Sequence, residues 1–162
     1  MIHFVFGPTG AGKSTYARQL ALDRSAIRFS VDEWMSALFF PDIRGELTFE
    51  WAMARVHRCE TQIWHITHQL LAQGKEVVLE ISMSTRQLRE KQIKLAETTQ
   101  FPYLLHYIDA DIDVRRARVR HRNKQKGSTY SFDVNDDMFD FVEKMFEAPT
   151  AQELEGVEVV KN

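Results

Sequence analysis

A glycine-rich loop, Gly7–Ser14, has the sequence GPTGAGKS and follows a short apolar segment, Met1–Phe6. The spacing G-x-x-x-x-G-K-[ST] is typical of a phosphate-binding loop, in which successive backbone N–H groups surround a phosphate oxygen. Lys13 would reach the β- and γ-phosphates, and the Ser14 hydroxyl would bind Mg²⁺. A helix that begins near Lys13 would add the positive end of its dipole beneath the anion. The loop therefore predicts binding of a nucleoside triphosphate through Gly7, Thr9, Gly10, Ala11, Gly12, Lys13, Ser14 and Thr15.

Asp32 follows a second apolar segment, Ile27–Ser30, and stands at the start of a short helical pattern. The carboxyl end of a parallel strand here would lie at the same sheet edge as the phosphate loop. A carboxylate at this edge can accept a proton from an attacking hydroxyl or hold Mg²⁺ through water. The alternative is helix capping, since Ser30-Val31-Asp32 is a good capping sequence. Asp32 is thus the candidate general base, and Glu33 is a weaker candidate for the same role.

Glu80 ends the run Glu76-Val77-Val78-Leu79-Glu80. An acid after an apolar strand is similar to the second acidic motif of nucleotide-hydrolysing and kinase proteins, where it organises Mg²⁺ or its water. That motif usually carries Asp, so the match is imperfect. An ionised carboxylate at the end of a buried strand is costly unless it is paired, which favours a functional role. We therefore expect Ser14 and Glu80 to be the metal-binding residues.

The segment between Asp113 and Lys126 is strongly basic. Its cationic residues are Arg115, Arg116, Arg118, Arg120, Arg122, Lys124 and Lys126. The simplest interpretation is a solvated helix face, with some arginines paired to Asp111 or Asp113.

A second interpretation of this segment is a lid over ATP. Arg115, Arg118 and Arg122 recur at i, i+3 and i+7, so they share one helix face. Guanidinium groups bind phosphate oxygens bidentately and stabilise transition-state charge. The polar stretch at 127–129 is typical of a mobile connection, so we expect a lid over about residues 115–131, led by Arg118 and Arg122.

The alternation of apolar runs with helical patterns predicts a parallel sheet covered by helices. The expected strands are Ile2–Phe6, Ile27–Ser30, Val77–Ile81, Leu104–Asp109 and Val157–Val160. Helical patterns follow the phosphate loop and Asp32, and then cover Thr48–Gln73, Arg86–Glu97, Ile112–His121 and Val134–Glu147, with a polar stretch at Arg122–Ser131. Five strands with right-handed crossovers predict a three-layer α/β/α sandwich, whose ligand lies beyond the carboxyl ends of the strands.

The length and composition favour a compact cytoplasmic protein. A chain of 162 residues fits one domain, 1–162, and the net charge of −2 argues against a surface that coats nucleic acid. Cys59 is the only cysteine, which excludes an internal disulfide and fits a reducing compartment. No apolar run approaches the ~20 residues that span a bilayer. The first strand begins at Ile2, which leaves no room for a signal peptide.

Taken together, these residues resemble the small P-loop kinases grouped with bacteriophage polynucleotide kinase, chloramphenicol phosphotransferase and zeta toxins. The specific parts are Gly7–Thr15, Ser30–Asp32, Glu80 and Arg122–Gly127. The resemblance implies a P-loop NTPase fold of the nucleoside kinase type with a helical lid, and ATP and Mg²⁺ as cofactors. It also implies that Asp32 is the general base and that the lid arginines contact the ATP phosphates. The expected catalytic residues are Lys13, Asp32, Arg118 and Arg122.

Two positions depart from the family pattern. Polynucleotide 5′-kinases carry an arginine three residues after the base, where this chain has Met35, followed by Leu38, Phe39 and Phe40. An apolar wall at this place disfavours a phosphorylated nucleotide and favours a less charged acceptor. The second lid cation, usually arginine, is Lys126, which keeps the charge but loses the planar fork.

The first functional hypothesis is an ATP-dependent phosphotransferase that acts on a hydroxyl of a small-molecule acceptor. Its close variant is a nucleoside or polynucleotide 5′-hydroxyl kinase. A second hypothesis is a P-loop ATPase or switch without an acceptor, in which Glu80 positions water and the acidic region 133–147 binds a partner. Nucleic-acid binding through the basic run is the third and is not favoured, and no membrane partner is expected.

Overall fold

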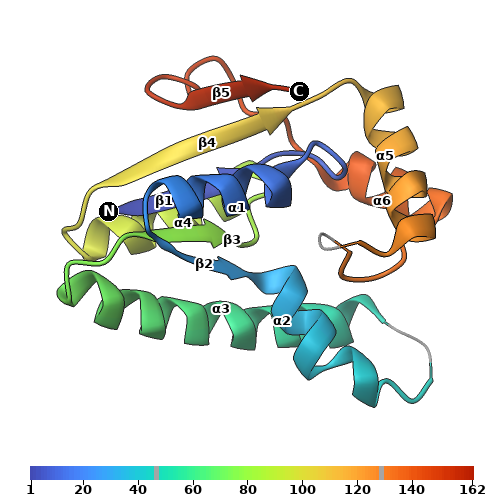
Figure 1. Cartoon of the computed structure of the whole chain (residues 1–162), viewed down its shortest axis with the longest axis horizontal. Coiled ribbons are helices and arrows are strands. Elements are labelled where there is room, and N and C mark those ends of the chain that lie inside the picture. Colours follow the sequence, from blue (N-terminus) through green and yellow to red (C-terminus); the bar gives the residue numbers. More distant parts are fainter. Residues whose placement is uncertain (46–47, 128–129) are drawn as a thin grey trace.

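The computed structural model describes residues 1–45, 48–127 and 130–162. Within these ranges the chain forms a five-stranded sheet in the order β2-β3-β1-β4-β5, with every neighbouring pair parallel (Figure 1). The strands are β1 (Ile2–Phe6), β2 (Ile27–Ser30), β3 (Val77–Glu80), β4 (Tyr103–Asp109) and β5 (Glu158–Lys161). The expected parallel sheet is thus confirmed, with each strand within one residue of its predicted bounds at either end.

The helices lie between the strands, as the pattern of the sequence predicts. They are α1 (Lys13–Asp23), α2 (Val31–Leu38), α3 (Phe49–Ala72), α4 (Arg86–Thr98), α5 (Ile112–Gln125) and α6 (Asp136–Met145), with a short 3-10 helix η1 (Phe40–Asp42). Thr48, Thr85 and Asn135 begin α3, α4 and α6 as side-chain N-caps. These caps satisfy N–H groups that have no partner inside the helix, which sets where each helix begins.

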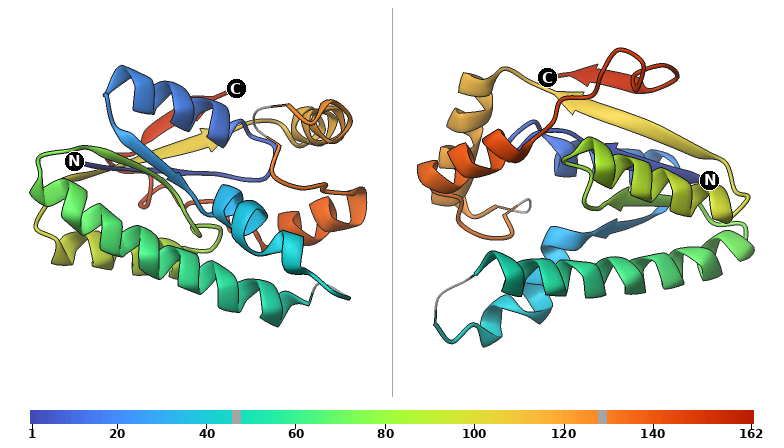
Figure 2. Two further views of the ribbon diagram at one scale, coloured as in Figure 1. Left: turned by 60° about the horizontal axis from the view of Figure 1, so that its bottom comes forward. Right: turned by 180° about the vertical axis from the view of Figure 1, so that it is seen from behind.

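Alternating residues of β1 face the two outer layers. Phe4 packs on one face with Ile63 of α3 and Ala96 of α4. Val5 packs on the opposite face with Ala17 and Ala21 of α1. Figure 2 shows α1 on one side of the sheet and α3 and α4 on the other, which confirms the three-layer α/β/α sandwich.

Helix α5 is longer than the sequence pattern predicts, because the polar stretch was expected to begin at Arg122. The helix instead continues to Gln125 and ends where Lys126 adopts a left-handed conformation with φ 46°. The Asn123 side chain donates to the Val134 carbonyl oxygen at 2.7 Å, which joins this last turn to the segment before α6. Arg122 is therefore fixed on a helix, while residues 128–129 of the expected lid lie outside the described residues.

Ion pairs between α5 and α6 take up a large part of the basic run. Arg116 donates to Asp140 at 2.6 Å, and Arg120 donates to Asp136 at 2.8 and 3.0 Å. The acids that neutralise these arginines come from α6 rather than from the start of α5, where Asp111 caps its own helix through the Asp113 N–H.

Arg89 of α4 connects the segment before β5 to the rest of the fold. Its buried guanidinium donates to Glu153 at 2.8 Å and to the Glu147 carbonyl oxygen at 2.8 Å. The hydrogen bond from Arg89 lowers the pKa of Glu153 from its ordinary value of 4.5 to about 2.

No helix among the described residues is long and apolar enough to cross a membrane.

Replacing Glu153 with Gln is expected to destabilise the protein by about 2 to 3 kcal/mol at pH 7, because a depressed carboxyl pKa is a stability contribution. That contribution is present above the unfolded pKa near 4.5 and is lost as the pH falls toward the folded pKa of about 2. Urea unfolding of both proteins at pH 7 and near pH 3 measures it. If the wild type and Glu153→Gln differ in unfolding free energy by the same amount at both pH values, the ion pair with Arg89 does not cause the difference.

Candidate active site

Four segments meet at the carboxyl edge of the sheet (Figure 1). The loop Gly7–Gly12 follows β1, α2 follows β2, Glu80 ends β3, and α5 follows β4 through a short turn. Because all strands are parallel, their carboxyl ends lie on one side, and residues far apart in sequence come together there.

The phosphate-binding loop has a backbone that requires glycine. Gly7 has φ +148° and Gly10 has φ +80°, values that side chains other than glycine rarely adopt. A Cβ on Gly7 would lie 2.1 Å from the Ile108 carbonyl oxygen, and one on Gly10 would lie 2.6 Å from the Arg115 carbonyl oxygen. The neighbouring strand and helix thus leave no room for larger residues. Lys13 Nζ donates to the Pro8 carbonyl oxygen at 2.9 Å, so its ammonium lies over the loop.

Arg115 supports this loop from the side of α5. Its side chain is 5% exposed and donates to the carbonyl oxygens of Thr9 at 3.3 Å and Ala110 at 2.9 Å. Both terminal nitrogens also bind Glu143 of α6, at 2.6 and 2.7 Å. Arg115 therefore differs from Arg118 and Arg122 on the same helix face, because its N–H donors bind groups within the protein and are not available to a ligand.

Two further side chains contact the loop at Ala11. Asn162, which follows β5, donates from Nδ2 to the Ala11 carbonyl oxygen at 2.9 Å. Arg118 lies over the same oxygen, with Nη1 at 3.5 Å, and is otherwise exposed. Arg118 thus stands beside the loop with most of its guanidinium accessible.

Asp32 lies in the first turn of α2 without capping it. The N-cap is Ser30, whose hydroxyl accepts from the Glu33 N–H at 3.4 Å, so the capping requirement is met without Asp32. Asp32 remains accessible to solvent, yet protein atoms surround it densely enough that burial raises the pKa of its carboxyl group. The charges of Lys13 and Arg122 act in the opposite direction and favour the carboxylate.

Lys13 is the common neighbour of the charged groups at this edge. Burial lowers the pKa of its ammonium, while the charges of Asp32 and Glu80 raise it and that of Arg122 lowers it again. Asp32, Glu80 and Arg122 therefore each lie within electrostatic range of Lys13, and Arg122 also lies within range of Asp32.

Arg28 of β2 holds two of the acids. Its Nε donates to Glu80 at 2.6 Å, and its terminal nitrogens donate to Glu33 at 2.7 and 3.1 Å. Glu33 also accepts from Arg18 of α1 at 2.7 Å, so this weaker candidate base is used in ion pairs. Glu80 is 8% exposed, and its pairing with Arg28 offsets the cost of burial that sequence reasoning identified.

The two remaining cations differ in their surroundings. The Nε of Arg122 is buried and has no hydrogen-bond partner among the residues that the structure describes. A buried donor of this kind needs an acceptor, which a phosphate oxygen can supply. Lys126 lies at the end of α5 with its ammonium 5.5 Å from the centre of the Tyr130 ring.

Met35 does not form an open wall beside Asp32. Its side chain is 3% exposed and packs with Cys59 and Trp51 between α2 and α3. The sequence interpretation of Met35 as part of the acceptor-binding surface is therefore wrong, because the residue fills the contact between the two helices.

Two residues that shape the site carry no expectation from the sequence: Arg28 and Asn162. Arg115, expected on one lid face with Arg118 and Arg122, is instead buried and paired with Glu143 of α6. The alternation in β2 places Arg28 between apolar residues, which is a signal for an internal ion pair. Nothing near Asn162 in sequence points to the phosphate loop.

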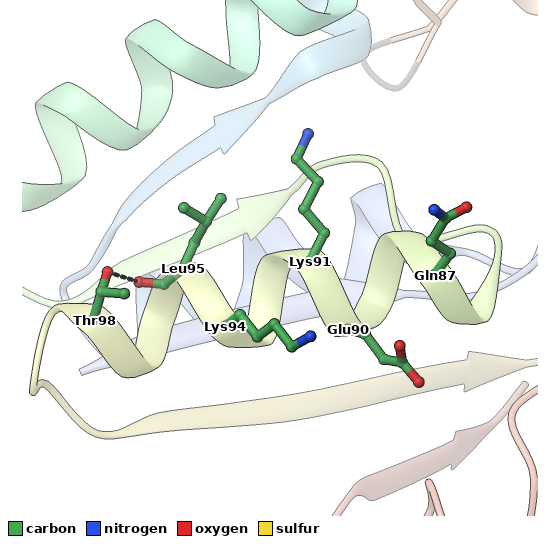
Figure 3. Close-up of a pocket in the computed structure, with 6 residues that line it drawn as sticks. All are labelled: Gln87, Glu90, Lys91, Lys94, Leu95 and Thr98. Atoms are coloured by element: carbon green, nitrogen blue, oxygen red, sulfur yellow. Dashed lines mark hydrogen bonds between the residues drawn. The ribbon is translucent and has the colours of Figure 1, made fainter.

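A hollow of about 490 Å³ lies on the exposed side of α4 (Figure 3). Its lining residues are Gln87, Glu90, Lys91, Lys94, Leu95 and Thr98. All six are exposed, and Lys91 and Lys94 point to different sides of the helix in Figure 3. None of them belongs to the candidate active site.

Comparison with known proteins gives a family and a set of similar folds. A family model described as AAA domain matches residues 2–149. A search of curated proteins found no significant match. The structure of Kti12 from Chaetomium thermophilum in complex with ADP-AlF3 is similar with a TM-score of 0.71 and 13% identity, over 100% of this chain and 88% of that chain.

Two further solved structures are similar along nearly the whole chain. A candidate kinase from Chloroflexus aurantiacus has a TM-score of 0.76 and 18% identity, over 99% of this chain and 86% of that chain. A gluconokinase from Sinorhizobium meliloti has a TM-score of 0.61 and 17% identity, over 99% of this chain and 79% of that chain. Identities this low show a shared fold and leave the substrate open. The match over residues 2–149 establishes that this chain belongs to the AAA domain family, and the similar structures show that it has a P-loop kinase-like fold.

Proposed function

We propose that this protein is an ATP-dependent phosphotransferase that moves the γ-phosphate of ATP to a hydroxyl of a small-molecule acceptor, with Asp32 as the general base. The observation that carries the proposal is the place of Asp32 in the first turn of α2, at the sheet edge that also carries the phosphate loop, where the charges of Lys13 and Arg122 act on its carboxyl group. An ATPase needs the loop and the cations, whereas a carboxylate with a raised pKa beside them also suits proton removal from an acceptor.

The nucleotide phosphates would lie in the loop after β1. Backbone N–H groups of residues 7–15 and the Lys13 ammonium would contact the phosphates, and the N-terminus of α1 lies beneath them. Arg122 would donate its buried Nε to a phosphate oxygen, since no described residue accepts from it. Arg118, beside Ala11, would contact the nucleotide from the solvent side, and Lys126 would follow at the end of the helix.

The residues present fit a magnesium ion. Ser14 is the second residue of α1, and Glu80 ends β3 with one oxygen held by Arg28. Mg²⁺ prefers such oxygen ligands and usually takes one or two from the protein, the others being phosphate oxygens and water. Ser14 and Glu80 would hold it, Glu80 directly or through water. When bound, Mg²⁺ neutralises charge on the β- and γ-phosphate oxygens.

The transfer step follows from these positions. Asp32 accepts the proton of the acceptor hydroxyl, whose oxygen forms a bond to the γ-phosphorus while the bond to the ADP oxygen breaks. Lys13 and Arg122 stabilise the charge that spreads over the transferring phosphoryl group. The product is a phosphorylated acceptor and ADP, and the proton remains on Asp32 until it passes to solvent.

Ion pairs between α5 and α6 argue against partner binding by the acidic region and against nucleic-acid binding by the basic run. Asp136, Asp140 and Glu143 of α6 are paired with arginines of α5, so the acidic region is largely used within the chain rather than offered to a partner. The same pairs neutralise cations that a nucleic-acid surface would need. We therefore favour a small-molecule acceptor over a polynucleotide. In this proposal residues 1–162 form one domain that acts in the cytoplasm, and a lid covers about residues 115–131.

The proposal is tested by ADP formation from ATP and Mg²⁺ with a panel of hydroxyl compounds, each measured against the rate without acceptor. We expect one class of compound to raise the rate at least about tenfold, since a positioned acceptor replaces water. A fast rate that no hydroxyl compound raises, and that another protein raises, would point to an ATPase or switch instead.

The pH dependence of kcat/KM is expected to be bell-shaped, with both limbs moved inward. Burial raises the pKa of Asp32, so activity is lost on the acidic side at a higher pH than an ordinary carboxyl group would cause. Burial lowers the pKa of Lys13, so activity is lost on the alkaline side at a lower pH than an ordinary lysine would cause. Steady-state rates from about pH 5 to pH 10 measure both limbs. The residual activity of Asp32→Asn should show no loss on the acidic side. An acidic limb that remains in this variant would show that a group other than Asp32 causes it.

A further inference from the structure

The Asn162 side chain lies against the peptide bond between Ala11 and Gly12 in the phosphate-binding loop. Its Nδ2 donates to the Ala11 carbonyl oxygen at 2.9 Å. A Cβ placed on Gly12 would lie 2.9 Å from the same nitrogen, so the amide group of Asn162 contacts both sides of this peptide. Arg118 reaches the same oxygen only at 3.5 Å. Asn162 is therefore the closer of the two donors that hold the Ala11 carbonyl group.

The peptide between Ala11 and Gly12 also carries an N–H group that a phosphate can use. A trans peptide is planar, so its C=O and N–H bonds point in opposite directions, and the described residues contain no cis peptide. The Gly12 N–H donates to no backbone carbonyl oxygen among those residues. In a loop of this spacing such N–H groups surround the anion. A donor bound to the Ala11 carbonyl oxygen thus keeps the Gly12 N–H directed away from Asn162 and available to a ligand.

This peptide plane is easy to rotate unless something holds it. Gly12 has φ +102°, and a residue without a Cβ tolerates many backbone orientations. The Ala11 side chain is fully buried, so the loop stays in place while the plane between the two residues can turn. A turned peptide would direct its carbonyl oxygen, rather than its N–H, toward a bound phosphate. The hydrogen bond from Asn162 opposes that rotation.

Strand β5 fixes Asn162 relative to the loop. The Asn162 backbone N–H donates to the Asp109 carbonyl oxygen at 2.9 Å and extends the pairing of β5 with β4, in which Lys161 lies opposite Asp109. At the start of β5, Glu158 accepts from the Tyr16 hydroxyl of α1 at 3.2 Å. Figure 1 shows β5 along the outer side of β4. The strand is thus attached both to its neighbour and to the helix that begins at the phosphate loop.

We propose that Asn162 is a positioning residue for the nucleotide phosphates. It holds the Ala11–Gly12 peptide in the orientation in which the Gly12 N–H donates to a phosphate oxygen, and it acts through the Ala11 carbonyl group without touching the nucleotide. This proposal rests on the placement of the phosphates in the function proposed above. It also accounts for the freedom of Arg118, because the Ala11 carbonyl oxygen keeps a hydrogen bond when Arg118 turns toward a ligand.

The orientation of the peptide can be measured directly. The chain contains a single Ala-Gly sequence, at residues 11–12, so alanine labelled with ¹³C at the carbonyl and glycine labelled with ¹⁵N report on this peptide alone. In the protein without ligand, Asn162→Ala should move the Ala11 carbonyl carbon signal upfield, because a carbonyl group that accepts a hydrogen bond is deshielded. Val159→Thr changes an exposed residue of the same strand and should leave the signal unchanged. The same Ala11 carbonyl signal in Asn162→Ala and in the wild type would overturn the proposal.

Ligand binding tests the consequence for the phosphates. Inorganic triphosphate carries the phosphate chain of ATP without the nucleoside, and calorimetric titration gives Kd for both. Asn162→Ala should raise both Kd values by about 10-fold or more, the size of one hydrogen bond to a charged group. Asn162→Gln retains the amide donor on a longer side chain and should recover part of the affinity. Weaker binding of ATP with unchanged binding of triphosphate would overturn the proposal, because it would mean that Asn162 contacts the nucleoside.

These measurements need no phosphoryl transfer, which separates this proposal from the proposed function. Loss of triphosphate affinity in Asn162→Ala, together with the shifted Ala11 signal, would support the positioning role even if no acceptor received the γ-phosphate. With an active acceptor, the same variant should raise KM for ATP about 10-fold and leave kcat nearly unchanged, and thermal unfolding confirms that it folds. Transfer with an unchanged KM for ATP would refute the positioning role and leave the phosphotransferase standing.

Discussion

Replacement of Asp32 by asparagine is expected to lower kcat for phosphoryl transfer by about 10²- to 10⁴-fold, the usual contribution of a positioned general base. Asparagine has nearly the same shape and cannot accept the proton. KM for ATP should change little, because in the proposed arrangement Lys13 and the loop backbone, rather than Asp32, hold the phosphates. Steady-state ADP formation with the acceptor identified from the panel gives both constants.

Asp42→Asn is the matched control for this variant. Asp42 is an exposed carboxylate in η1, close in sequence to α2 but outside the group of charges around Lys13. It should leave both constants unchanged. Equal turnover by the wild type and Asp32→Asn would remove Asp32 as the base and leave the carboxylate with a role in packing or charge balance.

Replacement of Arg122 by glutamine is expected to lower kcat by about 10³-fold or more, the range found when a cation that stabilises the transferring phosphoryl group is lost. The Arg122 Nε is buried without a partner among the described residues, and its charge acts on both Lys13 and Asp32. A donor in that position contributes most in the transition state, where phosphate charge is rearranged.

Arg120→Gln provides the comparison on the same helix. Arg120 is exposed and binds Asp136 of α6 with two hydrogen bonds, at 2.8 and 3.0 Å. A structural change in α5 would affect both variants, whereas a catalytic role affects only Arg122→Gln. The same loss of kcat in both variants would mean that the basic helix matters for stability rather than for transfer.

The sheet was predictable from the sequence because each strand is a short apolar run bounded by a turn or a helix start. Phe4 and Leu79, for example, lie in buried strands that the sequence marks clearly. The starts of α3 and α4 were predicted within one residue, at the caps Thr48 and Thr85. Helix α6 spans Asp136–Met145, two residues shorter at each end than the expected Val134–Glu147. The end of α5 differs from the prediction because Arg122–Gln125 is polar, although Arg122, Lys124 and Gln125 are good helix formers and Asn123 holds the last turn to Val134.

The candidate site was predictable in part, because spacing reveals motifs but not pairing. The loop, Asp32 and Glu80 lie at strand ends, where parallel topology brings them together. Which basic residues of α5 are paired depends on α6, because Glu143 binds Arg115 and Asp136 binds Arg120. The Arg122 Nε has no partner among the described residues. Such pairs are set by tertiary packing and leave no mark in the spacing of α5.

The position of Met35 illustrates the limit of reading a site from one segment. Its neighbours in sequence are apolar, which favoured an apolar acceptor wall. In the fold Met35 is buried against α3, where it packs with Cys59 and Trp51. Packing between α2 and α3 therefore accounts for the apolar side chain at this position.

The most direct test of the account follows the γ-phosphate itself. ATP labelled at the γ-phosphorus is mixed with the wild type and with Asp32→Asn, together with the panel of hydroxyl acceptors, and the label is traced over a single turnover. The account predicts that the wild type places the label on an acceptor oxygen and that Asp32→Asn does so about 10²-fold more slowly or less. Label that appears only as inorganic phosphate, at the same rate in both proteins, would contradict it.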